Sequence, residues 1–207
     1  MIRTTGFAIC IATILFVGSG LAWSQSQRAE SAEVKAEALE QSSSSEGDQT
    51  HPSPSGVITK PEAQAVDPAG EMPLDDALTC LARTIYWEAR GEETAGIEAI
   101  AHVVMNRLGH EGFPDTICEV VMQGSEQGAC QFSWWCDGLS DDAQEEEAYF
   151  LAKEIARKTL NKQLQDRTGG ALYFHRKDVT PQWSAEYLRT VVIGRHIFYK
   201  PDDGAAK

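Results

Sequence analysis

The run of residues 80–92 constrains the fold of this chain more than any other segment. Apolar residues in and just before it recur three and four positions apart, which is the spacing of one helix face: Leu78, Leu81, Ala82, Ile85 and Ala89. Gly91 stands where a glycine commonly ends a helix. The sequence therefore predicts an amphipathic helix over about residues 75–90, with the acidic side chain of Glu88 close to its end.

Glu88 follows two aromatic residues, Tyr86 and Trp87, and lies at the edge of the apolar face. A carboxylate half-hidden beside such rings is partly desolvated, and desolvation raises a carboxyl pKa. A raised pKa suits a general acid that works near neutral pH. Glu88 is therefore the candidate catalytic residue, and the alternative is an ordinary carboxylate paired with Arg83 or Arg90.

The remaining elements follow from the same periodicity and from glycine breaks. We expect helices over 94–108, 115–123 and 140–162, an irregular loop over 124–139, and strands over 171–175, 190–193 and 196–199. The strands all come after Gly169 and Gly170. The predicted fold class is therefore α+β and mainly helical, with a small C-terminal antiparallel sheet.

The N-terminal 24 residues have the pattern of a secretory signal peptide. Arg3 supplies a positive start, residues 6–17 are apolar, and Ala22-Trp-Ser24 fits a cleavage site between small residues. An uncleaved membrane anchor is the alternative, although the apolar stretch is short for a membrane span. We expect the mature chain to be periplasmic or secreted, or membrane-anchored if the segment is retained.

Residues 25–73 are rich in Ser, Glu, Ala, Gln and Pro, and their apolar residues are few and scattered. Such a composition is typical of a disordered segment, here an acidic tether. The prediction is thus a tether over 25–73, a folded domain over 74–200 and a flexible tail over 201–207.

Four cysteines remain after the predicted signal peptide: Cys80, Cys118, Cys130 and Cys136. An even number in an exported chain favours two disulfides, for which three pairings are possible. Four free thiols are the alternative. A zinc site is disfavoured because no Cys-x-x-Cys or His-Glu-x-x-His pattern is present. We therefore expect neither a metal nor a cofactor.

Charge excludes one class of function. The chain carries 31 acidic and 18 basic residues, for a net charge of −13. A nucleic-acid binder would present a basic face, so we expect no nucleic-acid partner. A neutral glycan, in contrast, is bound by aromatic stacking and hydrogen bonds.

Six short blocks along residues 78–199 carry a resemblance to a known family. They are Glu88-Ala-Arg-Gly-Glu92, the segment 99–107, Gln131-Phe-Ser-Trp134, Gly170-Ala-Leu-Tyr-Phe-His175, Pro181-Gln-Trp183 and Gly194-Arg-His-Ile-Phe198. Together they resemble the SleB/CwlJ-type cell wall hydrolase family, whose best-known members are spore cortex-lytic enzymes. The resemblance implies a lysozyme-like or resuscitation-factor-like catalytic domain, in which a glutamate ends a helix that faces a groove.

The resemblance also implies an activity on peptidoglycan glycan strands. The expected reaction is lytic transglycosylation of the β-1,4 bond between N-acetylmuramic acid and N-acetylglucosamine, with Glu88 as the single acid and base and a 1,6-anhydro sugar as product. The residues carried over as lining the groove are Gln131, Phe132, Ser133, Tyr173, His175 and Trp183. Tyr86, beside Glu88, completes the predicted substrate-binding set.

Two alternatives stay open. A hydrolytic muramidase needs a second carboxylate, for which Glu98 is the first candidate and Glu92 and Asp137 are others. A non-catalytic peptidoglycan-binding or regulatory module would keep the groove without the reaction. The tether also leaves room for an envelope protein as a partner.

Overall fold

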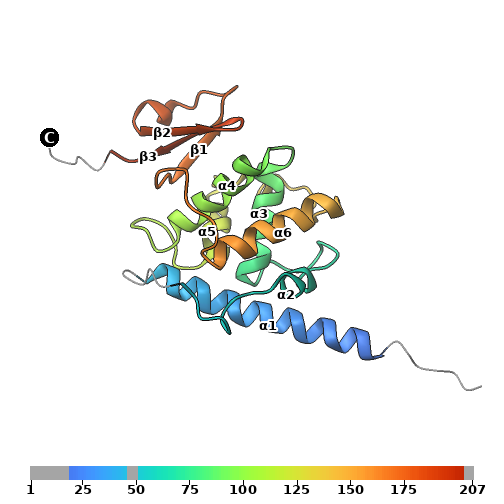
Figure 1. The fold of residues 1–207 in the computed structure, drawn as a ribbon. Helices are drawn as coiled ribbons and strands as arrows, with labels where there is room; N and C mark the ends of the chain where they lie inside the picture. The colour runs from blue at the N-terminus through green and yellow to red at the C-terminus, as the bar shows by residue number, and fades with distance from the viewer. Residues whose placement is uncertain (1–18, 46–50, 203–207) are drawn as a thin grey trace, which may run out of the picture.

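A computed structural model describes residues 19–45 and 51–202. Its helices are α1 (Ser19–Ser44), α2 (Lys60–Ala65), α3 (Ala77–Ala89), α4 (Thr94–Arg107), α5 (Ile117–Met122) and α6 (Glu146–Leu160). Short 3-10 turns are η1 (Ser125–Gln127), η2 (Ser133–Trp135) and η3 (Gln182–Ala185), and the strands are β1 (Tyr173–Arg176), β2 (Leu188–Ile193) and β3 (His196–Lys200). The predicted α+β fold, mainly helical with a C-terminal antiparallel sheet, is confirmed (Figure 1).

Helix α3 is the centre of the helical body. Its residues from Ala77 to Tyr86 are all buried, and it packs against α4, α5 and α6. The Asp76 carboxylate accepts a hydrogen bond from the Thr79 backbone N–H at 2.9 Å and so caps the helix start. Gly91, just past the end, has φ +80°, a conformation that favours glycine. The prediction of a helix over 75–90 is therefore confirmed to within two residues at each end.

The prediction of a disordered tether over 25–73 is wrong. Helix α1 buries Ala32, Ala36 and Leu39, which are 0%, 0% and 5% exposed, and Figure 1 shows α1 running along the helical body beside α2. The Lys35 ammonium lies 2.7 Å from the Glu62 carboxylate and joins the two helices. Composition misleads here because a narrow stripe of small apolar residues is enough to hold a helix in place when it packs against a partner surface. The segment belongs to the folded body, so the reason for expecting an envelope partner at a tether disappears.

Two further boundaries differ from prediction. The helix expected over 140–162 begins only at Glu146, because the backbone before it is held by tertiary hydrogen bonds: the Asp141 carbonyl accepts from Arg83 and Trp87. The helix expected over 115–123 starts at Ile117 and is capped by the Thr116 hydroxyl. The predicted signal peptide falls mostly on residues outside the described part, as does most of the predicted tail. Among the helices in the described residues, none has the length and apolar character to cross a membrane.

The strands form an antiparallel sheet in the order β1-β3-β2. Residues paired across it alternate between its faces. Phe174 and Phe198 are paired neighbours and face the core, whereas Tyr173 and Tyr199 are paired neighbours on the opposite face. Strand β1 is an edge strand, so its outer edge is free to form one wall of a groove.

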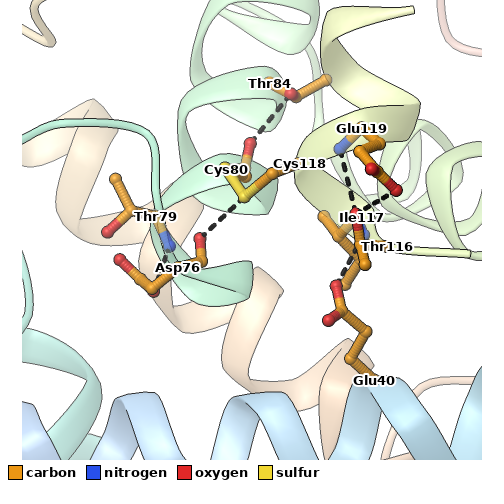
Figure 2. The surroundings of a disulfide bond; sticks show 9 residues. All are labelled: Glu40, Asp76, Thr79, Cys80, Thr84, Thr116, Ile117, Cys118 and Glu119. Carbon is orange, nitrogen blue, oxygen red and sulfur yellow. Dashed lines mark hydrogen bonds between the residues drawn. A yellow bond between two sulfur atoms is a disulfide. The ribbon is translucent and has the colours of Figure 1, made fainter.

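The structure pairs Cys80 with Cys118 and Cys130 with Cys136, one of the three pairings that the sequence allows. Figure 2 shows the first bond, which joins α3 to α5. Below it, the Glu40 carboxylate of α1 accepts a hydrogen bond from the Ile117 backbone N–H at 2.5 Å, at the start of α5 (Figure 2). The disulfide and the capping carboxylate together hold α5 between α1 and α3.

Candidate active site

A groove of about 900 Å³ lies between the end of α3, the end of α4, the loop closed by Cys130 and Cys136, and the edge of the sheet. Its lining residues are Trp87, Glu88, Arg107, Cys130, Gln131, Ser133, Trp134, Asp137, Tyr173, Phe174, His175, Arg176, Val179, Pro181, Trp183, Tyr187 and His196. The groove therefore combines one half-buried carboxylate, one buried guanidinium and a wall rich in aromatic rings.

Glu88 is the last residue but one of α3 and is half-buried in the groove. Burial raises the pKa of its carboxyl from 4.5 to about 7, while the positive charge of Arg107 pulls the pKa the other way. Within the described residues, no hydrogen bond or ion pair to its carboxylate is formed. A group with a pKa near 7 both donates and accepts protons efficiently at neutral pH, which is the behaviour required of a general acid and base.

Arg107 is the last residue of α4 and is 3% exposed. Its Nε donates to the Leu172 carbonyl at 2.7 Å, and its guanidinium carbon lies 5.0–5.7 Å from the ring centroids of Phe132, Phe113 and Tyr173. Burial lowers its pKa to about 10, so it stays charged at neutral pH. Only its place in the 99–107 block marked this residue in the sequence, where it reads as the end of a helix.

The sheet side of the groove is aromatic. Tyr173 and Tyr187 stack with ring centroids 4.6 Å apart, and Trp183 lies 5.8 Å from each of them. His175 is 5.6 Å from the Trp183 ring and its Nε2 lies 3.0 Å from the Tyr199 hydroxyl. Flat rings of this kind stack on the apolar faces of sugars while their polar atoms bind hydroxyls. Sequence reasoning missed Tyr187, which lies outside the six blocks.

The structure brings most of the predicted site residues together. Glu88 shares the groove with Gln131, Ser133, Tyr173, His175 and Trp183. Tyr86 does not reach it: its side chain is 2% exposed, and its hydroxyl accepts hydrogen bonds from Arg90 and from the Glu145 backbone N–H. Residues two positions apart on a helix point to nearly opposite sides, which is why Tyr86 and Glu88 separate.

Phe132 is likewise in the core and does not line the groove. It is 0% exposed, and its ring lies under the Arg107 guanidinium and 6.5 Å from the Phe174 ring. Its neighbours Gln131 and Ser133 are exposed and point into the groove. The prediction of substrate contacts for Tyr86 and Phe132 is therefore corrected, because both side chains are buried in the core.

The other candidate carboxylates differ in whether they line the groove with Glu88. The Glu92 side chain is 3% exposed and lies 2.7 Å from the Arg195 Nε, outside the groove. Glu98 is on α4 and does not line the groove. Asp137 does line it, is exposed, and accepts a hydrogen bond from the Leu139 backbone N–H at 2.8 Å. Of these three candidates, Asp137 is the one that shares the groove with Glu88.

Metal binding has no candidate centre in the part of the chain that the structure describes. Over residues 19–45 and 51–202, His, Cys, Asp and Glu side chains form no group of three that could hold an ion. The four cysteines of the described part are used in disulfides, and His102 is 8% exposed on α4 within the helical body.

Comparison with known proteins gives a consistent result. A family described as Cell Wall Hydrolase matches residues 91–199, a region that starts three residues after Glu88. A spore cortex-lytic enzyme of Halalkalibacterium halodurans is 32% identical over 129 residues, which cover 60% of this chain and 34% of that one. A spore cortex-lytic enzyme of Bacillus cereus is 27% identical over 173 residues, which cover 81% of this chain and 62% of that one. The chain thus spans less than two thirds of the length of these relatives.

Two solved structures are also similar to this chain. The catalytic domain of the Bacillus cereus SleB protein is 27% identical, with 60% of this chain and 89% of that chain covered and a TM-score of 0.43. The catalytic domain of the germination-specific lytic transglycosylase SleB from Bacillus anthracis is also 27% identical, with 60% and 93% covered and a TM-score of 0.44.

Proposed function

The chain belongs to the Cell Wall Hydrolase family, and from this premise we propose that it is a peptidoglycan lytic transglycosylase with Glu88 as its single acid and base. The observation that carries the proposal is the position of Glu88. It is a half-buried carboxyl in a groove, at the end of a buried helix, with its pKa raised by burial to about 7. The relatives named as spore cortex-lytic enzymes support peptidoglycan as the substrate.

The proposed reaction uses one carboxyl group twice. Protonated Glu88 donates its proton to the oxygen of the β-1,4 bond between N-acetylmuramic acid and N-acetylglucosamine, and the bond from that oxygen to C1 of muramic acid breaks. The Glu88 carboxylate then accepts the proton of the C6 hydroxyl of the same muramic acid, and that oxygen closes on C1. The product is a 1,6-anhydro sugar, and Glu88 returns to its protonated form.

The remaining groove residues have binding roles in this proposal. The rings of Tyr173, Trp183 and Tyr187 stack on sugar faces, and the exposed side chains of Gln131 and Ser133 hydrogen-bond to the substituents of the sugars. A neutral glycan bound in this way needs no basic surface, in agreement with the net charge of −13.

The proposed substrate lies outside the cytoplasm, so we propose a periplasmic or secreted enzyme. The two disulfides fit an oxidising compartment. The signal peptide predicted for residues 1–24 would provide export, and it stays a prediction.

A hydrolytic muramidase is the second candidate because Asp137 lines the same groove as Glu88. In that reaction a second carboxylate activates water or forms a covalent intermediate, and the product is a reducing sugar. Asp137 is exposed whereas Glu88 is half-buried, so we favour the reaction with a single carboxyl group.

The test is mass spectrometry of purified peptidoglycan sacculi after digestion by the full chain, with Glu88→Gln and Asp137→Asn as variants. We expect 1,6-anhydro products from the wild type and from Asp137→Asn, and none from Glu88→Gln. Reducing products, heavier by one water and lost in both variants, would establish the muramidase instead. Binding to sacculi without any product would favour a non-catalytic module.

A further inference from the structure

The Arg107 side chain is buried and only partly satisfied. Its Nε has a partner in the Leu172 carbonyl, yet its Nη1 is buried and has no hydrogen-bond partner. Native proteins rarely leave a buried charged donor unpaired, because the loss of hydration is then not compensated. An unpaired donor beside a reactive group suggests that its hydrogen-bond acceptor becomes charged only during the reaction.

The Glu88 carboxyl, which lines the same groove, is the candidate partner. Arg107 and Glu88 line the same groove, from the ends of α4 and α3, and the charge of Arg107 acts on Glu88. Three rings and the Leu172 carbonyl fix the guanidinium in place. Because the guanidinium is held before the reaction starts, only the Glu88 side chain has to turn for the hydrogen bond to form.

We propose that Arg107 is a positioning residue that acts through Glu88: its buried Nη1 donates a hydrogen bond to the Glu88 carboxylate each time that carboxylate forms. The inference rests on the proposed function and adds a residue to it. When Glu88 gives its proton to the glycosidic oxygen, a negative charge appears in a desolvated site, and a charge-assisted hydrogen bond from Arg107 stabilises it. When the carboxylate takes the proton of the C6 hydroxyl, the hydrogen bond is released.

Other titratable and charged groups line the groove with Glu88, and two of them have partners elsewhere. The titratable and charged residues that line the groove with it are Arg107 of α4, Asp137 of the loop after η2, Tyr173, His175 and Arg176 of β1, Tyr187 before β2, and His196 of β3. Arg176 is exposed and pairs with Asp178 at 3.0 Å, and His196 lies 3.7 Å from Glu92. Of these residues only Arg107 contributes a charge effect on the Glu88 carboxyl.

The first test is the pH profile of kcat/KM for glycan strands with full-chain variants. Arg107→Gln removes the positive charge, so the Glu88 pKa should rise and the alkaline limb should move up by roughly one pH unit. The same variant should lower kcat about 10²-fold, because the carboxylate formed during the reaction loses its stabilising donor. Arg107→Lys keeps the charge. The alkaline limb of its pH profile should therefore stay at the wild-type position, and its kcat should fall less than about tenfold.

The matched control is Arg83→Lys, at a second buried arginine that pairs with Asp67 and does not line the groove. Arg83→Lys should lower the free energy of unfolding and leave the alkaline limb of the kcat/KM profile at its wild-type pH. Arg107→Gln could instead lose activity only in proportion to its loss of folded protein, with the alkaline limb at the wild-type pH. Arg107 would then have a structural role alone, and the proposal would be overturned.

A second measurement needs neither activity nor an Arg107 variant. In ¹⁵N-arginine spectra of the full chain, the side-chain N–H signals of Arg107 should shift as pH rises through about 7, the pKa of Glu88. Glu88→Gln should abolish this response. A wild-type spectrum in which no arginine responds would refute the hydrogen bond even if the enzyme proves to be a transglycosylase. A clear response without enzymatic products would count against the proposed function alone.

Discussion

Asp67 and Arg83 form an ion pair with 2.7 Å between nitrogen and oxygen, and their side chains are 0% and 2% exposed. Burial alone would raise the pKa of Asp67, but hydrogen bonds from Tyr149, from the Met72 backbone and from Arg83 outweigh it and hold the pKa below its usual value. Arg83 also donates to the Asp141 carbonyl, which accepts from Trp87 of the groove as well. The pair thus ties the segment before Leu74 to the helix that carries Glu88.

We expect a chain that begins at Leu74 to be largely unfolded. It would lack α1, α2 and Asp67 and leave Arg83 as a buried unpaired charge. Removing one partner of a buried pair costs about 3–5 kcal/mol, a large part of the roughly 5–15 kcal/mol that stabilises a typical domain. Urea unfolding followed by circular dichroism measures this.

The matched point variant is Asp67→Ala in the full chain, which should lower the free energy of unfolding by about 3–5 kcal/mol. Asp178→Ala breaks the Arg176 pair, whose side chains are 56% and 64% exposed, and should have no measurable effect. An unchanged urea midpoint in the Leu74 chain would show that the N-terminal helices add nothing to the domain.

Glu88→Gln should stabilise the protein at alkaline pH. The folded-state pKa of Glu88 is raised from 4.5 to about 7, so the folded state binds this proton more tightly than the unfolded state. That contribution to stability is complete below about pH 4.5 and is lost as pH rises through about 7. Glutamine cannot ionise, so at about pH 8 the variant should be more stable than the wild type by up to about 3 kcal/mol.

The control is the same pair of proteins at about pH 4, where both side chains are neutral and their free energies of unfolding should agree. Equal stability at both pH values would mean that Glu88 is not desolvated in the folded protein.

The two disulfides should have different roles. Replacing Cys80 and Cys118 with alanine opens a loop of sequence separation 38 and should cost about 4 kcal/mol of stability. Replacing Cys130 and Cys136 with serine opens a separation of only 6 and should cost about 2 kcal/mol. The second bond closes the loop that carries Gln131 and Ser133, so its loss should raise KM for glycan strands roughly tenfold. Thermal unfolding and steady-state kinetics separate the two effects, and identical losses in both would contradict this division.

Tyr187→Ala should weaken glycan binding about tenfold, because the ring that stacks on Tyr173 at 4.6 Å is part of the groove wall. Tyr86→Phe is the matched control. Its hydroxyl bonds only Arg90 and the Glu145 backbone, so its loss should cost about 1 kcal/mol of stability and leave KM unchanged. Binding to sacculi and urea unfolding measure the two. A raised KM in Tyr86→Phe would restore the sequence-based prediction for Tyr86.

Local patterns predicted the parts of this fold that depend on near neighbours in the chain. The apolar periodicity before Glu88 and the glycine after the helix act within a few residues, so the position of Glu88 at a helix end could be predicted. The strands at the C-terminus are similar, because glycine breaks and alternating residues mark them. The prediction failed for α1, whose stripe of Ala32, Ala36 and Leu39 is apolar enough only against a partner surface.

What the sequence by itself determined is therefore the helix that carries Glu88, the late sheet and the supply of aromatic residues for the groove. Only the tertiary structure decided which side chains reach that groove, how the cysteines pair and where the N-terminal segment lies. Arg107 comes near Glu88 because α3 and α4 pack together, and Asp67 meets Arg83 across 16 residues. Such contacts depend on how the helices and strands pack in three dimensions. The free energies of burial and charge pairing at those contacts therefore cannot be predicted from a short segment of the sequence.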